Sequence, residues 1–146
     1  MVRIAICFGL GKLPAPGTWG SIPGLLIGGL MSLYLDNWGA LAALIVLGIL
    51  SYIAIAITEA TWHTHDDKRI VIDEVIGCAL AVAFTPPQPS FWLLGFVLFR
   101  IFDIAKPGPV GYVDKNIQSS WGTLFDDVIA GILAAICLSI LNALTL

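Results

Sequence analysis

The stretch from Ala40 to Ile57 reads ALAALIVLGILSYIAIAI and contains no acidic, basic or histidine side chain. As an α-helix, a segment of this length extends about 27 Å, close to the thickness of the hydrocarbon core of a bilayer. The stretch from Val128 to Leu146 is equally apolar and one residue longer. These two stretches predict helices that are long enough to cross a membrane.

Three shorter apolar stretches accompany them, at residues 22–35, 70–84 and 91–104. They span a bilayer only if polar ends extend them or if the bilayer thins locally. Turn-forming residues separate the stretches at 36–39 and at 85–90, where three prolines end any helix. We therefore expect an all-α fold. It would be a single domain over residues 1–146, an integral membrane bundle with about five membrane-embedded or crossing helices and a cytoplasmic N-terminal loop.

The composition supports a membrane protein. Hydrophobic residues make up 58% and charged residues 12% of the chain, and the mean hydropathy is +0.94. An ordinary soluble domain carries roughly 25% charged residues, so the alternative would be an unusually apolar soluble helical protein. The net charge of -3 and the absence of a basic stripe argue against a nucleic-acid partner. The three cysteines lie far apart in apolar runs, which indicates free thiols.

The charges have a one-sided distribution if the five stretches cross alternately. One side then receives all seven basic residues, namely Arg3, Lys12, Lys68, Arg69, Arg100, Lys106 and Lys115. By the positive-inside rule this side is cytoplasmic, which places the N-terminus inside and the C-terminus outside. The same side receives every acidic residue except Asp36. Acidic residues contribute little to orientation, so a metal or phosphate site is the leading explanation for their clustering.

Two acidic pairs open apolar stretches in the same way. Asp73-Glu74 is followed by Gly77, and Asp126-Asp127 is followed by Ala130-Gly131. Small residues let membrane helices approach closely, so the two helix starts are expected to bring four carboxylates together. A hard cation such as Mg²⁺ would offset their repulsion, or one acid could stay protonated. Each pair alone could also be a hydrated helix end or favourable acid at a helix N-terminus.

Two further segments carry polar chemistry. The loop Gly11–Ser21 is rich in Gly and Pro, and Ser21 is expected to cap the following helix, whose free N–H groups would suit an anion. The alternative is a mere turn and cap. Further along, a spacing of three places Arg100 beside Asp103, and Asp103 beside Lys106, on a helix that Pro107 ends. That pattern could instead be an intrahelical ion pair with side chains that reach the membrane surface.

Taken together, these segments resemble the phosphatidylglycerophosphatase A family. The matching motifs are the proline-led PGT-x-GS loop at 14–21, His65-Asp66 with I-V-x-DE-x-x-G at 70–77, FR-x-x-D-x-x-KP-x-P at 99–109, and the acidic and small pairs at 126–127 and 130–131. The chain departs from the family pattern in three places. A single residue separates the two prolines of the loop, Ser119-Ser120 replaces a Gly-Gly, and Gly108 and Gly111 follow Lys-Pro where bulky or basic residues are common.

The resemblance implies an all-helical, multi-pass enzyme of the bacterial inner membrane with its active site on the cytoplasmic face. It would convert phosphatidylglycerophosphate to phosphatidylglycerol and phosphate with Mg²⁺ as cofactor and a membrane phospholipid as substrate. The expected catalytic residues are Asp73, Glu74, Asp103 and Asp127. The expected metal ligands are Asp73, Glu74, Asp126 and Asp127. The expected substrate-binding residues are Lys12, Thr18, Ser21, Arg100 and Lys106. Whether a carboxylate or a metal-bound water attacks phosphorus stays open.

Two alternative functions remain at this stage. Intramembrane acids also serve ion pathways, so a non-enzymatic small transporter or membrane assembly subunit is possible, although the two longest stretches contain no acid or base. A phosphatase for another lipid head group is the second alternative, motivated by Gly108 and Gly111. Other phosphatase chemistries fit badly, because the chain contains no C-x5-R loop, no D-x-D motif and only two, closely spaced, histidines.

Overall fold

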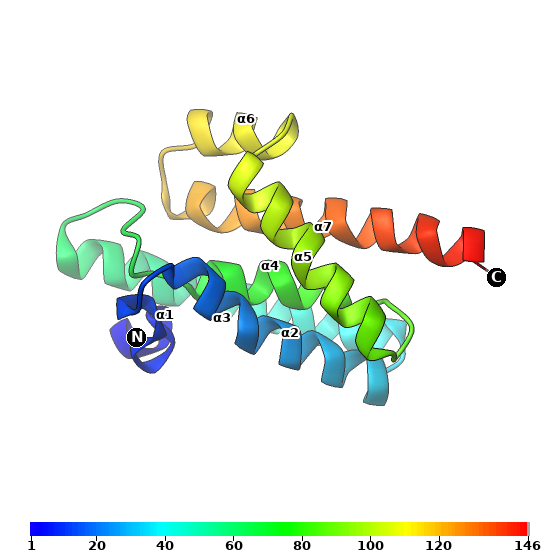
Figure 1. The fold of residues 1–146 in the computed structure, drawn as a ribbon. Coiled ribbons are helices and arrows are strands. Elements are labelled where there is room, and N and C mark those ends of the chain that lie inside the picture. Colours follow the sequence, from blue (N-terminus) through cyan, green and yellow to red (C-terminus); the bar gives the residue numbers. More distant parts are fainter. Residues whose placement is uncertain (146) are drawn as a thin grey trace.

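The structure is a computed structural model that describes residues 1–145, and within this range it contains helices and no strand (Figure 1). The elements are α1 (Val2–Ala5), η1 (Cys7–Lys12), α2 (Pro16–Tyr34), α3 (Asn37–Trp62), α4 (Ile72–Ala83), α5 (Pro89–Ala105), α6 (Pro109–Asn116) and α7 (Ser120–Thr145). The predicted all-α class is confirmed. The five expected apolar helices are α2, α3, α4, α5 and α7, and the short α6 was not expected.

Within residues 1–145, α3 and α7 are the two helices that are long and apolar enough to cross a membrane. Each has 26 residues, so each is longer than the apolar stretch that predicted it. At its start, α3 is capped by Asp36, whose carboxylate accepts a hydrogen bond of 2.9 Å from the backbone N–H of Gly39. Helix α7 begins at Ser120, well before the apolar stretch, and therefore carries both of its acids inside the helix. Both helices leave large apolar side chains exposed, such as Ile45 and Ile136.

Helix α4 is the buried centre of the bundle. It packs against α2, α3, α5 and α7 (Figure 1), and ten of its twelve residues are buried. A helix of this length extends only about 18 Å. Because helices surround it, α4 buries Asp73 and leaves Glu74 only partly exposed, and both acids line a cavity between the helices.

Glycines allow α2 to approach α4 closely. Gly24 and Gly28 of α2 lie one turn apart and face the α4 backbone. A Cβ atom on Gly24 would lie 2.4 Å from the carbonyl oxygen of Val75, and one on Gly28 would lie 2.5 Å from that of Ala79. Cβ atoms in proteins essentially never show contacts this short, so these positions require glycine for the observed packing.

A second close approach joins α4 to α7, immediately after their acids. A Cβ atom on Gly131 would lie 2.3 Å from the carbonyl oxygen of Gly77, and one on Gly77 would lie 2.7 Å from the carbonyl oxygen of Asp127. Ala130 beside them is fully buried. The prediction that small residues let the two acid-bearing helices meet is therefore confirmed.

The start of α2 differs from the prediction. The helix begins at Pro16, because proline is preorganised for the first helical position. Ser21 is consequently buried inside the helix, where its hydroxyl donates a hydrogen bond of 2.7 Å to the carbonyl oxygen of Gly17. The expectation that Ser21 caps the helix is wrong. The residue before the helix is Ala15, in a left-handed conformation.

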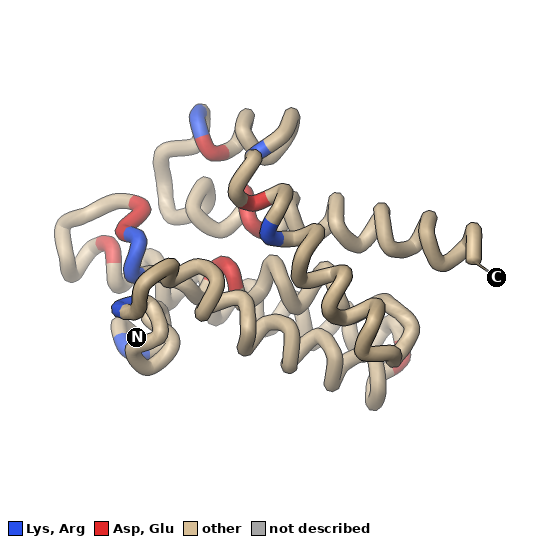
Figure 2. Tube along the Cα trace, in the orientation of Figure 1, with Lys and Arg blue, Asp and Glu red and all other residues tan. Residues whose placement is uncertain are grey.

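The charged residues gather at one end of the bundle (Figure 2). At the opposite end the chain reverses direction after α2 and again after α4 (Figure 1), and Asp36 belongs to the first of these two turns. The loop between α3 and α4, the end of α5 and the first turns of α7 meet at the charged end. The polar chemistry of the protein is therefore assembled where helices start and stop.

Candidate active site

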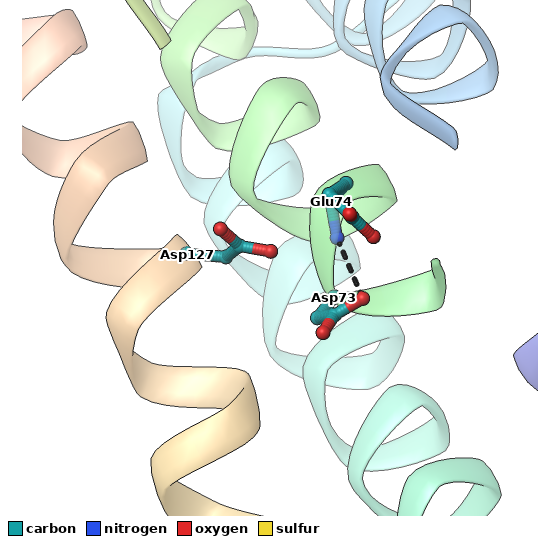
Figure 3. Close-up of side chains that lie close together, drawn as sticks. All are labelled: Asp73, Glu74 and Asp127. Atoms are coloured by element: carbon teal, nitrogen blue, oxygen red, sulfur yellow. Dashed lines mark hydrogen bonds between the residues drawn. The ribbon is translucent and has the colours of Figure 1, made fainter. Parts of the chain in front are cut away.

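Three carboxylates converge between α4 and α7. Asp73 and Glu74 lie in the first turn of α4, and Asp127 points toward them from α7 (Figure 3). One carboxylate oxygen from each residue can be chosen so that all three oxygens lie within 4.8 Å of one another. Asp73 and Asp127 are almost fully buried. Burying like charges at this separation is unfavourable unless a positive charge or a proton compensates them.

The donor set of this cluster suits a hard divalent cation. All three side chains offer oxygen, and Mg²⁺ binds through a few carboxylates together with water and substrate phosphate. Glu74 provides a second observation, because its buried Oε2 atom has no hydrogen-bond partner among residues 1–145. Asp73 is better satisfied, since its Oδ1 accepts a hydrogen bond of 3.1 Å from the backbone N–H of Glu74 (Figure 3). The residues present therefore fit a magnesium ion.

The carboxylate cluster forms one wall of a cavity of about 290 Å³. The other lining residues are Ala15, Pro16, Gly17, Asp66, Asp67, Lys68, Ile70, Arg100, Asp103, Ile104, Lys106 and Asp126. The first turn of α2 packs closely against one side of this cavity. A Cβ atom on Gly17 would lie 2.6 Å from Oε1 of Glu74 and 2.9 Å from Nη1 of Arg100. A helix N-terminus, a carboxylate cluster and a guanidinium group thus share one small cavity.

Arg100 lines the same cavity as the carboxylate cluster. Its guanidinium donates a hydrogen bond to Asp103 one turn along α5, as the spacing predicted. The Nε–H of Arg100 is buried and has no partner within the described chain. Asp103 therefore orients a guanidinium whose charge partly offsets the acids of the cavity.

Lys106 takes partners that the sequence did not predict. Helix α5 ends at Ala105, and Lys106 adopts a left-handed conformation that directs it away from the helix. Its ammonium group donates to Asp114 of α6 and, at 2.8 Å, to Asp126 of α7. The expected pairing of Asp103 with Lys106 is therefore wrong. Burial acts to lower the pKa of Lys106, but the two carboxylates outweigh it and raise this pKa above its ordinary value.

This ion pair also distinguishes the two acids of α7. Asp126 lines the cavity, but Lys106 neutralises its carboxylate, and it does not belong to the group of close oxygen atoms formed by Asp73, Glu74 and Asp127. The four expected metal ligands therefore lie around one cavity, and three of them form the cluster. The fourth lies beside it in a separate ion pair.

The loop residues expected to bind substrate are placed differently. Lys12 and Thr18 are exposed, Ser21 is fully buried, and these three do not line the cavity. The early start of α2 is the reason, because it presents the backbone of residues 15–17 instead. The PGT motif thus reaches the site, but through its Pro and Gly and not through its hydroxyl groups.

One residue of the cavity and one residue beside it were not singled out from the sequence. Lys68 lines the cavity from the loop between α3 and α4. Its neighbours are paired with each other: Arg69 donates to Asp67 at 2.8 and 2.9 Å and lowers the pKa of that carboxyl to about 2. Glu59, near the end of α3, was also missed. The charge-rich run after His65 was a signal for Lys68, whereas no local pattern indicated Glu59.

The structure is an all-helical bundle with two apolar helices of span length. Carboxylates and basic groups lie together at its polar end. These features define a membrane-associated protein equipped for phosphate chemistry. The family model for phosphatidylglycerophosphatase A matches residues 3–142. Phosphatidylglycerophosphatase A of Haemophilus influenzae is 37% identical over 91% of this chain and 83% of its own length. The protein of the same name from Escherichia coli is 33% identical over 90% of this chain and 77% of its own length.

The chain therefore belongs to the phosphatidylglycerophosphatase A family, and it is a phosphatase. A further relative, from Bacteroides thetaiotaomicron, is 34% identical over 95% of this chain and 91% of its own length, and is named provisionally as a phosphatidylinositol-3-phosphatase. No solved structure matches the chain significantly. The resemblance inferred from the four motifs is confirmed, and the enzymatic reading prevails over a transporter or assembly subunit.

Proposed function

We propose that this chain is a Mg²⁺-dependent phosphatase that converts phosphatidylglycerophosphate to phosphatidylglycerol and phosphate in the bacterial inner membrane. The observation that carries the proposal is the cluster of Asp73, Glu74 and Asp127, which shares its cavity with Arg100. Buried carboxylates alone would repel a phosphate, so a cation is needed before an anionic substrate can enter. The named relatives support the phosphatase activity.

The residues of the cavity would have different roles in the reaction. Asp73, Glu74 and Asp127 would hold the magnesium ion, which polarises the phosphoryl group and activates water when it is bound. Arg100, oriented by Asp103, would donate hydrogen bonds to the phosphoryl oxygens. In the first turn of α2, the backbone N–H of Gly17 would add a donor, together with the positive end of the helix dipole; Pro16 has no N–H, and those of Thr18 and Trp19 donate to Ala15. Lys106 would hold the carboxylates of Asp114 and Asp126 in place at the cavity edge.

We also propose that the bundle lies in the membrane with its charged end in the cytoplasm. The two span-length helices and the one-sided distribution of charge support this orientation (Figure 2). Helices α2, α4 and α5 would be embedded beside α3 and α7, with α4 shielded from lipid by its neighbours. The cavity would then lie at the depth of the lipid head groups, where the phosphomonoester group of a membrane lipid is located.

The head group can be tested with purified protein in detergent micelles. Phosphate release would be measured from phosphatidylglycerophosphate, phosphatidic acid and phosphatidylinositol 3-phosphate at one Mg²⁺ concentration. We expect the highest kcat/KM for phosphatidylglycerophosphate. A faster reaction with another lipid would reassign the substrate, and equal rates would refute any head-group preference. Absence of phosphate release from all three lipids would refute the proposed activity.

A further inference from the structure

Glu59 forms a buried hydrogen-bond centre next to the cavity. The residue is only 8% exposed. Oε1 accepts hydrogen bonds from the backbone N–H of Asp66 at 2.9 Å, from Nδ1–H of His65 at 3.0 Å and from the hydroxyl of Thr123 at 3.2 Å. Oε2 accepts a hydrogen bond from the hydroxyl of Ser120. Four donors from two other segments thus converge on one side chain.

Helix stability does not explain a glutamate at this position. Glu59 lies in the last turn of α3, which ends at Trp62. The C-terminal end of a helix carries a partial negative charge, so an acidic side chain there is unfavourable. The interactions that compensate this placement are those with the neighbouring segments.

The two segments that Glu59 joins are those that carry the carboxylate cluster. Asp66 belongs to the loop that lines the cavity and leads directly into Asp73 and Glu74 at the start of α4. Thr123 lies one turn before Asp127 on α7. Glu59 therefore joins the loop that leads into α4 to the first turn of α7.

We propose that Glu59 is a positioning residue, which sets the separation of the α3–α4 loop from the first turn of α7 and thereby the spacing of the three clustered carboxylates. Productive geometry at such sites requires placement within about 0.5 Å, and this precision depends on side chains held by surrounding hydrogen bonds. The consequence for catalysis rests on the proposed function. The consequence for the carboxylate spacing does not.

The test compares Glu59→Ala with Glu59→Gln, using Thr61→Ala as a matched control. Thr61 lies in the same turn, but its hydroxyl is exposed and donates only to Ile57 of its own helix. Mn²⁺ affinity would be measured by electron paramagnetic resonance, and kcat and KM by phosphate release below the melting temperature of each variant. We expect Glu59→Ala to lose about tenfold in Mn²⁺ affinity and in kcat, with little change in KM. Gln keeps a carbonyl acceptor and should restore most of both, and Thr61→Ala should match the wild type.

The outcomes separate this inference from the proposed function. A Glu59→Ala variant that melts lower but keeps wild-type Mn²⁺ affinity and kcat would show a purely structural role and overturn the inference. Wild-type protein that releases no phosphate, while Glu59→Ala still weakens Mn²⁺ binding, would refute the proposed function and support the positioning role.

If Glu59→Ala does not fold, Ser120→Ala and Thr123→Val release the α7 side alone. Both variants should bind Mn²⁺ more weakly than the wild type. Wild-type Mn²⁺ affinity in both variants would overturn the inference.

Discussion

Asp127→Asn and Asp73→Asn should each lower phosphate release by about a hundredfold or more. Asparagine keeps the shape of aspartate but removes the charge that a divalent cation requires, and the metal contributes several kcal/mol to stabilising the transition state. Phosphate release from phosphatidylglycerophosphate at saturating Mg²⁺ measures the effect. Asp36→Asn is the matched control. Asp36 lies at the opposite end and caps α3, a role that asparagine fills equally well, so this variant should keep full activity.

Stability should respond in the opposite sense to activity. Each substitution at Asp73 or Asp127 removes one of several buried like charges, so the metal-free variants should melt no lower than the wild type. Added Mg²⁺ should stabilise them less, because a ligand stabilises a protein only through its binding to the native state. Thermal melting with and without Mg²⁺ checks both statements. An Asp73→Asn protein that is fully active and equally stabilised by Mg²⁺ would remove Asp73 from the site.

Arg100→Gln should lower kcat/KM by about a hundredfold. The substitution removes the guanidinium that is proposed to bind the substrate phosphate, and loss of a single preorganised donor at a reacting anion typically costs this much. It also leaves Asp103 without its partner, which adds negative charge to a cavity that must admit an anion. Arg3→Gln is the control, because Arg3 is exposed and does not line the cavity.

A second variant separates the charge of Arg100 from its geometry. Lysine keeps the positive charge but cannot form the bidentate, planar contacts of a guanidinium. Arg100→Lys should therefore recover only part of the loss, mainly in KM. Steady-state kinetics of the two variants provide the comparison. An Arg100→Gln enzyme with unchanged kcat/KM would exclude Arg100 from substrate binding.

The carboxylate cluster was predictable because its signal is local and repeated. Two acidic pairs, each followed within about one turn by a small residue, indicated two helix starts that approach each other. The structure shows this approach at Gly77 and Gly131. The pattern could not show which acid would be neutralised by a basic residue. That outcome depends on Lys106, which leaves the end of α5 and contacts Asp126 twenty residues away.

The rest of the site depends on helix boundaries and long-range contacts. Ser21 was expected at a helix start, but Pro16 begins the helix earlier, so the cavity receives the backbone near Gly17 instead. The role of Glu59 depends on Ser120 and Thr123, more than sixty residues away in the chain. Neither periodicity nor composition contains such information. Only the packing of α3 against α7 places these side chains together.

We propose that phosphate release depends on a divalent cation held by the cluster of Asp73, Glu74 and Asp127. The most direct measurement uses protein stripped of metal with EDTA, then transferred to metal-free buffer and assayed with phosphatidylglycerophosphate during stepwise addition of Mg²⁺. We expect no phosphate release without metal and full recovery with Mg²⁺ in the wild type. We expect no recovery in Asp127→Asn over the same range. Full activity of the stripped wild-type protein would show that phosphate release does not depend on a bound cation.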